Sequence, residues 1–160
     1  MELILWRHAE AEDANGKADS DRELTKKGRR QSERMALWLR PKLATDWKVL
    51  VSPARRTLQT VAPLGLDYTT SEMVGLGASQ RSILEAARWP DGDDNVLVVG
   101  HQPTLGEVIA HLLKGEDGDV SVRKGAIWWF ATRRRRDGGR DEDNKETILK
   151  AVLNPDLLDD

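Results

Sequence analysis

Three short, largely apolar runs constrain the fold of this chain more than any other feature of its sequence. They cover Glu2 to Trp6, Trp47 to Val51 and Val96 to Val99, and none of them shows the polar alternation of a half-exposed strand. Runs of this kind are typical of strands that are covered on both faces. Because helix-length segments separate the runs, the sequence predicts parallel strands joined by right-handed crossovers.

The remaining elements follow from capping and turn residues. Helices are expected from Thr25 to about Arg40, Pro53 to about Ala62, Ser79 to Trp89 and Pro103 to about Leu113, with Ala9 to Glu23 as a loop, a short strand near Tyr68 to Ser71, and Gly115 capping the last helix. Ala126 to Thr132 and Glu146 to Val152 flank the charged segment Arg133 to Asn144 and predict a C-terminal β-hairpin. The predicted fold is an α/β three-layer sandwich in which helices flank a mostly parallel central sheet.

Chain length and composition narrow the class of protein. The 160 residues fit a single domain over residues 1–160. The absence of Cys excludes disulfides, thiolate catalysis and Cys metal sites, and it suits a reducing compartment, so we expect a cytoplasmic protein. The apolar runs are far shorter than the roughly 20 residues that span a membrane, and the N-terminus does not resemble a secretory leader.

The charge balance argues against a nucleic-acid partner. The net charge is -2, which provides no general attraction for a polyanion. Arg133 to Arg136 form a basic run, but acidic residues follow it closely and no aromatic side chain interrupts it. This segment is therefore interpreted as a solvated hairpin tip.

Reactive side chains follow each of the three predicted strands directly. Arg7 and His8 follow the first strand, Ser52 to Arg56 follow the second, and Gly100 with His101 follow the third. Ligands of open parallel sheets bind outside the carboxyl ends of the strands, where these loops converge. Imidazoles and guanidiniums around one crevice suit an anion, and the arginine fork matches phosphate. The sequence therefore predicts a phosphoryl-binding site.

Taken singly, these residues also have plain structural interpretations. A histidine at a strand end is more often a hydrogen-bonded structural residue than a catalyst. Ser52 could be an N-cap with Pro53 at the first helical position, which would leave the following arginines exposed. The joint placement of the three clusters favours the functional interpretation.

Four ordered blocks of this sequence resemble those of the histidine phosphatase superfamily, which has also been called phosphoglycerate mutase-like. They are Leu3 to Ala9, Leu24 to Gly28 with Gln31, Ser52 to Thr60, and Gly100-His101. Together they spread over about two thirds of the chain. The short length and the absence of a large insertion before His101 are similar to the SixA-like phosphohistidine phosphatases of that superfamily.

The resemblance implies a role for each matched residue. His8 corresponds to the nucleophile that forms a phosphohistidine intermediate, and Arg7 to the arginine that grips phosphate beside it. The family's second arginine stands four positions after the serine, which selects Arg56 rather than Arg55, and His101 corresponds to the second catalytic histidine. Arg22 is an additional candidate for substrate binding. His111 is interpreted as structural, and the family chemistry requires neither a metal nor a cofactor.

A general acid is not evident in the sequence. Many relatives use a carboxylate from the segment after the second helix, but Val74 to Ser79 contains none, and only Glu72, Glu10 and Glu12 are near the motifs. An alkyl phosphate would suffer from that lack, because proton transfer contributes about 100- to 10,000-fold to the rate. An imidazole leaving group needs less help, which favours a phosphohistidine substrate.

The leading hypothesis is therefore a phosphatase that hydrolyses phosphohistidine on a protein, such as a phosphotransfer domain of a signalling system, through a covalent intermediate on His8. The alternatives are a small-molecule phosphomonoesterase of the same superfamily and a phosphate- or phosphoprotein-binding module without catalysis.

Overall fold

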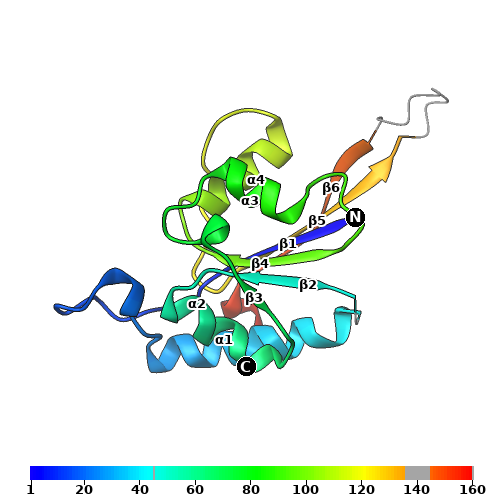
Figure 1. The fold of residues 1–160 in the computed structure, drawn as a ribbon. Coiled ribbons are helices and arrows are strands. Elements are labelled where there is room, and N and C mark those ends of the chain that lie inside the picture. Colours follow the sequence, from blue (N-terminus) through cyan, green and yellow to red (C-terminus); the bar gives the residue numbers. More distant parts are fainter. Residues whose placement is uncertain (45, 136–144, 160) are drawn as a thin grey trace.

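A six-stranded sheet with strand order β3-β2-β4-β1-β5-β6 lies at the centre of the molecule (Figure 1). The structure is a computed structural model, and it describes residues 1–44, 46–135 and 145–159. The strands are β1 (Glu2–Arg7), β2 (Lys48–Val51), β3 (Thr69–Thr70), β4 (Val96–Gly100), β5 (Ile127–Arg134) and β6 (Lys145–Leu153), and the helices are α1 (Lys26–Leu39), α2 (Arg55–Val61), α3 (Gln80–Ala87) and α4 (Thr104–Lys114).

The sheet is mostly parallel, as the sequence predicts. β3, β2, β4 and β1 pair in parallel, and β5 is antiparallel to both β1 and β6. β5 and β6 form the expected hairpin, which extends away from the rest of the sheet in Figure 1. Residues 136–144, the greater part of the loop predicted between these strands, lie outside the described residues.

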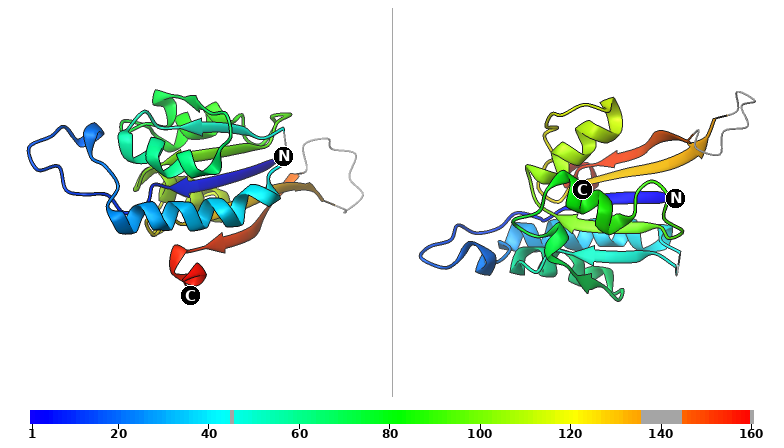
Figure 2. Two further views of the ribbon diagram at one scale, coloured as in Figure 1. Left: turned by 90° about the horizontal axis from the view of Figure 1, so that it is seen from below. Right: turned by 45° about the horizontal axis from the view of Figure 1, so that its top comes forward.

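Two layers of helices cover the sheet, so the expected three-layer sandwich is confirmed (Figures 1 and 2). Leu3 and Leu5 of β1 pack in one core cluster with residues of α3 and α4, while Ile4 and Trp6 pack in a second cluster with residues of α1 and α2. Successive side chains of a strand point to opposite faces. A strand that serves two cores must therefore be apolar at every position, which is why the runs lack polar alternation.

The beginning of α2 differs from the expectation. Pro53 was expected in the first turn of a helix, but α2 begins at Arg55 and Ala54 is its N-cap with extended backbone (φ -60°, ψ 140°). The Ser52 side chain contacts the imidazole of His101, and the Ser52 carbonyl accepts a hydrogen bond from Thr57 Oγ1 at 2.8 Å. Because Ser52 is held in these contacts, the segment from Ser52 to Ala54 forms a turn that precedes the helix.

The other helix ends agree with the sequence to within one or two residues, apart from short 3₁₀ turns. Thr25 caps α1 by accepting a hydrogen bond from the Gly28 amide, and Gly115 ends α4 in the left-handed conformation with φ 70°. Pro41 and Pro63 end the α-helical hydrogen bonding but not the helical path of the chain. Each lies near the start of a 3₁₀ turn that continues the preceding helix. None of the described helices has the length and apolarity needed to cross a membrane.

Gly28 allows the N-terminal turn of α1 to approach the loop that follows β1. A Cβ atom built on Gly28 would lie 2.0 Å from the backbone oxygen of Glu10. That same oxygen accepts a hydrogen bond from the Thr25 amide at 3.0 Å. The glycine thus brings the helix cap against the segment that begins at His8.

We expect Gly28→Ala to destabilise the protein by about 1–3 kcal/mol, because the helix and the loop must separate to admit the methyl group. In an ordinary helix interior the same substitution stabilises by about 1 kcal/mol, so the expected sign is reversed. Urea unfolding monitored by circular dichroism measures the difference. Gly77→Ala is the control, since a Cβ atom at Gly77 has nothing within 4 Å, and equal unfolding midpoints for the two variants would contradict the close approach.

Candidate active site

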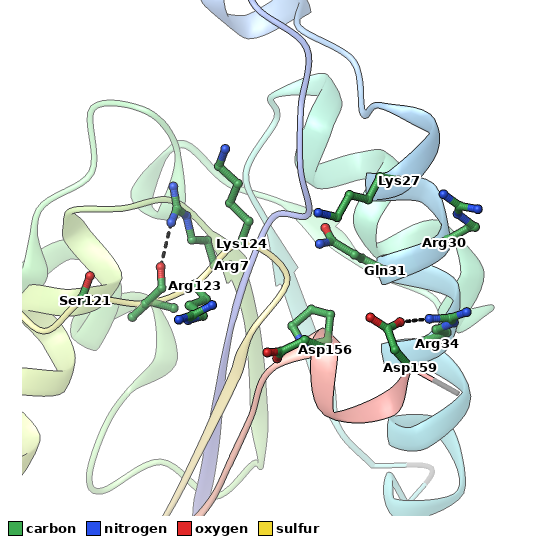
Figure 3. Close-up of a pocket in the computed structure, with 12 residues that line it drawn as sticks. Arg7, Lys27, Arg30, Gln31, Arg34, Ser121, Arg123, Lys124, Asp156 and Asp159 are labelled. Atoms are coloured by element: carbon green, nitrogen blue, oxygen red, sulfur yellow. Dashed lines mark hydrogen bonds and ion pairs between the residues drawn. The ribbon is translucent and has the colours of Figure 1, made fainter.

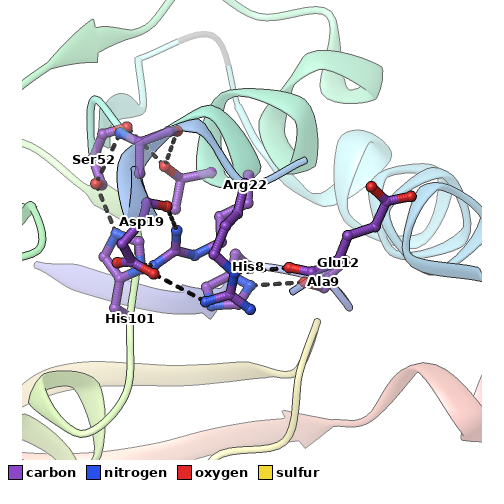
Figure 4. Close-up of polar contacts among 10 residues, drawn as sticks. His8, Ala9, Glu12, Asp19, Arg22, Ser52 and His101 are labelled. Atoms are coloured by element: carbon purple, nitrogen blue, oxygen red, sulfur yellow. Dashed lines mark hydrogen bonds and ion pairs between the residues drawn. The ribbon is translucent and has the colours of Figure 1, made fainter. Parts of the chain in front are cut away.

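The carboxyl ends of β1, β2 and β4 bring the three predicted clusters together. Arg7 of β1 pairs with Gly100 of β4, and the His8 amide donates to the Gly100 carbonyl at 3.1 Å. The Ser52 amide donates to the carbonyl of Val99 at 3.0 Å. As a result the rings of His8 and His101 lie with their centroids 5.4 Å apart (Figure 4).

His8 presents one ring nitrogen to the site and anchors the other. Its Nδ1 lies 2.7 Å from the carbonyl oxygen of Ala9. A carbonyl can only accept a hydrogen bond, so Nδ1 carries the hydrogen and Nε2 of the neutral ring carries the free electron pair. The ring is therefore oriented as a nucleophile or as a hydrogen-bond acceptor.

His101 is oriented by Ser52, a contact that the sequence analysis did not assign. His101 Nε2 lies 2.7 Å from Ser52 Oγ, and this oxygen already accepts a hydrogen bond from the Ala54 amide at 3.3 Å. The Ser52 hydroxyl hydrogen is thus available to Nε2, which favours the tautomer with hydrogen on Nδ1. Nδ1 itself is buried and has no hydrogen-bond partner in the described part of the chain.

Both rings are held in the neutral form. Burial is the main reason why the pKa of His8 falls from 6.5 to about 3, and the positive charges of Arg56 and Arg7 act in the same direction. Burial also lowers the pKa of His101 to about 4, and the charge of Arg56 is the next cause. At neutral pH the pair consists of one free acceptor nitrogen and one N–H donor.

Arg56 is buried, whereas its neighbour Arg55 is exposed. The side chain of Arg56 is 4% exposed and that of Arg55 is 56% exposed. The plain structural interpretation, in which the arginines after Ser52 are exposed helix residues, is therefore excluded for Arg56. Ser52 is also not the N-cap of α2. Arg56 lies among the strand ends near both imidazoles, since its charge contributes to both lowered pKa values.

Asp19 is the carboxylate that accompanies Arg56, and the sequence analysis did not single it out. Arg56 Nη1 donates to the Asp19 carbonyl at 2.6 Å, and Arg56 Nη2 lies 3.2 Å from Asp19 Oδ2. Arg22 Nη1 lies 3.1 Å from the other carboxylate oxygen. These contacts, led by the hydrogen bond from Arg22, hold the pKa of Asp19 below its usual value. The loop after β1 thus places an ionised carboxylate between two guanidiniums (Figure 4).

The remaining residues singled out in the sequence are Arg7, Arg22 and His111, and they lie at different distances from the two histidines. Arg7 Nη1 donates to the Val122 carbonyl at 2.7 Å, and burial lowers the pKa of its guanidinium. Arg22 joins the site through Asp19 and through its Nε, which donates to the Glu12 carbonyl at 2.7 Å. His111 is an exposed residue of α4 and is not among the contacts of the site.

Three polar side chains of the sequence motifs brace the loop backbone. Thr60 Oγ1 accepts from the Ala9 amide at 3.1 Å, Gln31 Oε1 accepts from the Glu10 amide at 3.0 Å, and Gln59 Oε1 accepts from the Leu24 amide at 2.7 Å. These side chains satisfy backbone groups that have no partner in the sheet. They fix the positions of the residues that follow His8.

None of the three carboxylates near the motifs is engaged with the two histidines. Glu10 Oε1 accepts from Thr25 Oγ1 at 3.0 Å, and Glu72 is an exposed residue in a 3₁₀ turn. The Glu12 side chain is directed away from the two rings in Figure 4. Within residues 1–44, 46–135 and 145–159, no three His, Asp or Glu side chains are grouped so that they could hold a metal ion.

The arrangement suits a tetrahedral oxyanion. Two guanidiniums and an N–H of His101 can contact oxygens, while Nε2 of His8 can approach the central atom. His101 Nδ1 and the Nε atoms of Arg7 and Arg56 are buried and have no hydrogen-bond partner among the described residues. The site is thus rich in donors and poor in acceptors.

Comparisons with known proteins point to one family. The family model described as the histidine phosphatase superfamily, branch 1, matches residues 3–77. Over 128 residues the chain is 31% identical to the phosphohistidine phosphatase SixA of Escherichia coli, with 72% of this chain and 76% of the relative covered. It is 35% identical over 121 residues to an uncharacterized protein of Mycobacterium tuberculosis, with 73% and 77% covered.

Solved structures share the fold over nearly the whole chain. The structure of the protein histidine phosphatase SixA complexed with tungstate superposes with a TM-score of 0.77 at 26% identity. The alignment covers 99% of this chain and 100% of that chain. A phosphoserine phosphatase of Entamoeba histolytica, at 16% identity and a TM-score of 0.68, shows the same fold.

The lowered pKa values predict that both rings stay neutral between pH 7 and pH 5. The NMR ring signals of His8 and His101, assigned through His8→Asn and His101→Asn, should not shift over this range. In the unfolded chain imidazole has a pKa near 6.5, so only the unfolded chain gains these protons as the pH falls. Stability should thus be complete above about pH 6.5 and decrease below it, by on the order of 1–2 kcal/mol per ring at pH 5. A titration midpoint near 6.5 for either ring would contradict the burial.

Ser52→Ala tests the orientation of His101. Loss of the hydroxyl leaves both nitrogens of a buried ring without a partner, which should cost about 1–3 kcal/mol of unfolding free energy. The nitrogen-15 shifts of His101 should change from one dominant tautomer to a mixture. Ser32→Ala is the control, because Ser32 is also buried but donates to the Arg29 carbonyl within α1. Unchanged nitrogen shifts in Ser52→Ala would show that Ser52 does not set the tautomer.

Proposed function

The chain belongs to the histidine phosphatase superfamily and is a phosphatase, and we propose that it hydrolyses phosphohistidine carried on a protein through a covalent intermediate on His8. The observation that carries the proposal is the orientation of His8. Its Nδ1 is bound to the Ala9 carbonyl, and burial keeps the ring neutral, so that Nε2 has a free electron pair at neutral pH.

The reaction proceeds in two displacements at phosphorus. Nε2 of His8 attacks the phosphoryl group of a phosphohistidine that is protonated on its other ring nitrogen. A bond from Nε2 to phosphorus forms, the bond from phosphorus to the substrate ring breaks, and this ring leaves as neutral imidazole. A water oxygen then attacks the same phosphorus, releases inorganic phosphate and restores the free ring of His8. The proton of that water leaves with phosphate or to solvent.

The charged groups stabilise the phosphoryl oxygens during both steps. Arg7 and Arg56 supply positive charge, and Nδ1 of His101 supplies a hydrogen-bond donor fixed in direction by Ser52. Their donors are already in place in the folded chain, so little reorganisation is needed when charge develops. Arg22 is positioned through Asp19 to bind substrate oxygens beside them.

Three observations favour a phosphohistidine substrate over an alkyl phosphate. The E. coli relative at 31% identity is a phosphohistidine phosphatase. Asp19, the carboxylate beside Arg56, is held ionised by its lowered pKa and so is a poor proton donor. The segment between β2 and β4 contains only α2, β3, α3 and short turns, so no inserted domain covers the strand ends.

Phosphate release from two substrates tests the proposal. We expect the wild type to release phosphate faster from a phosphohistidine-bearing phosphotransfer domain than from p-nitrophenyl phosphate, and to do so equally well in EDTA. His8→Ala should lose about 1000-fold or more of this activity, because the nucleophile is gone. Arg56→Ala should lose most of it, while Arg55→Ala, which removes an exposed neighbouring charge, should keep it.

Each other outcome has a definite meaning. Turnover of p-nitrophenyl phosphate alone would retain the phosphatase mechanism and assign a small-molecule substrate. Phosphate binding without turnover of either compound would assign a binding module. Activity that EDTA removes and added metal restores would contradict the mechanism through His8.

A further inference from the structure

A strongly basic cavity of about 700 Å³ adjoins the candidate active site, and we call it the basic groove (Figure 3). Its cationic lining residues come from β1, from α1 and from the segment before β5. They are Arg7, Lys27, Arg30, Arg34, Arg123 and Lys124. Figure 3 shows Arg123 and Lys124 on one side of the groove and the residues of α1 on the other.

Positive charge predominates in the groove. Among the described residues, six cationic side chains line it against two carboxylates, Asp156 and Asp159. Asp159 forms an ion pair with Arg34. Among the described residues Arg30, Arg123 and Lys124 form no ion pair, so the groove keeps a surplus of positive charge that a bound anion could neutralise.

The groove borders the loop that carries His8. Arg7 lines the groove and directly precedes His8, and Lys124 immediately precedes Gly125, whose amide donates to the His8 carbonyl at 2.9 Å. Gln31 lines the groove and also accepts the hydrogen bond from the Glu10 amide. The groove thus lies beside the backbone of His8, where the surface around a protein-borne phosphohistidine could contact it.

The arrangement of the cations favours an extended acidic segment over a compact ligand. Lys27, Arg30 and Arg34 stand at helix positions i, i+3 and i+7, which is a row about 10 Å long on α1. No aromatic side chain is among the described residues that line the groove, and its apolar lining consists of Val122 and Pro155. It offers a row of charges and no platform for a nucleobase or another flat organic group.

From this geometry we propose that the basic groove binds an acidic surface of the protein that carries the phosphohistidine, and so selects substrates with carboxylates near the phosphorylated residue. The proposal rests on the function proposed above and adds the charge of the substrate protein to it. The active site supplies the chemistry, and the groove supplies recognition of the residues around the phosphohistidine.

Synthetic phosphohistidine peptides provide the test. One peptide carries glutamates beside the phosphohistidine, and a matched peptide carries serines. We expect the wild type to show a KM at least about fivefold lower for the acidic peptide, with similar kcat values. This preference should decrease as the salt concentration rises, because salt screens exposed charges.

Charge reversal in the groove should remove the preference. Arg30→Glu and Lys124→Glu, one on each side, are each expected to raise the KM for the acidic peptide about fivefold and to leave p-nitrophenyl phosphate turnover unchanged. Arg29→Glu is the matched control: Arg29 is an exposed neighbour on the same helix, and it does not line the groove. An equal effect of Arg29→Glu, or no effect of the two groove variants, would overturn the proposal.

A binding measurement separates this proposal from the proposed catalytic function. Fluorescence anisotropy of a labelled, unphosphorylated glutamate peptide should show weaker binding to Arg30→Glu than to the wild type and to Arg29→Glu. This result would support the groove even if no phosphohistidine peptide were hydrolysed. If Arg30→Glu instead impaired only the turnover of a sugar bisphosphate and did not affect the binding of the peptide, the groove would serve a second phosphate and the proposal would be wrong.

Discussion

The candidate active site is organised around two neutral imidazoles that lie buried beside two permanent cations. The rings of His8 and His101 are 5.4 Å apart, and each is only 6% exposed. Burial penalises an additional positive charge, and the nearby arginines strengthen this effect. The guanidiniums remain charged because their intrinsic basicity is far higher. The same environment therefore combines an unprotonated ring nitrogen with a positive field, and the proposed attack on a phosphoryl group requires both.

The sheet makes this arrangement rigid. His8 is held through its backbone on two sides, by the Gly100 carbonyl and by the Gly125 amide, and through its ring by the Ala9 carbonyl. The loop that continues from it is braced by the side chains of Gln31 and Thr60. In the proposed mechanism a nucleophile fixed in this way would lose little freedom in the reaction, and pre-organisation of this kind is a main source of catalytic power in enzymes. Several polar residues of the family motifs therefore hold the backbone around His8 in place.

Much of the fold was predictable from the sequence because the apolar runs of β1, β2 and β4 are typical of strands that are covered on both faces. A strand that packs against helices on both faces must be apolar at successive positions, and that pattern is visible without coordinates. The convergence of the three reactive clusters was predictable from the same runs, since parallel strands end at one edge. The choice of Arg56 over Arg55 came from the spacing of the family motif, and the structure separates these two arginines by burial.

Ser52 and Asp19 were not predictable as partners of the site, for different physical reasons. A serine before a proline at a strand end is a good helix cap, and only the position of His101 across the sheet shows that its hydroxyl is engaged elsewhere. Asp19 stands in a polar loop without periodicity, where carboxylates are common and most are simply solvated. Its contact with Arg56 spans 37 positions of the chain and depends on how the loop folds back over α2. Contacts of this range require the tertiary structure.

Local charge, and not net charge, explains how a slightly acidic protein can attract an anionic substrate. The net charge of the chain is -2, yet Arg7, Arg56 and the cations of the basic groove gather around one end of the sheet. The remainder of the chain is correspondingly acidic. At physiological ionic strength charges are screened beyond about 8 Å, so an approaching substrate responds to the charges of the surface that it faces. An anion is favoured at the site and its groove, and the electrostatic field thereby contributes to orientation as well as to binding.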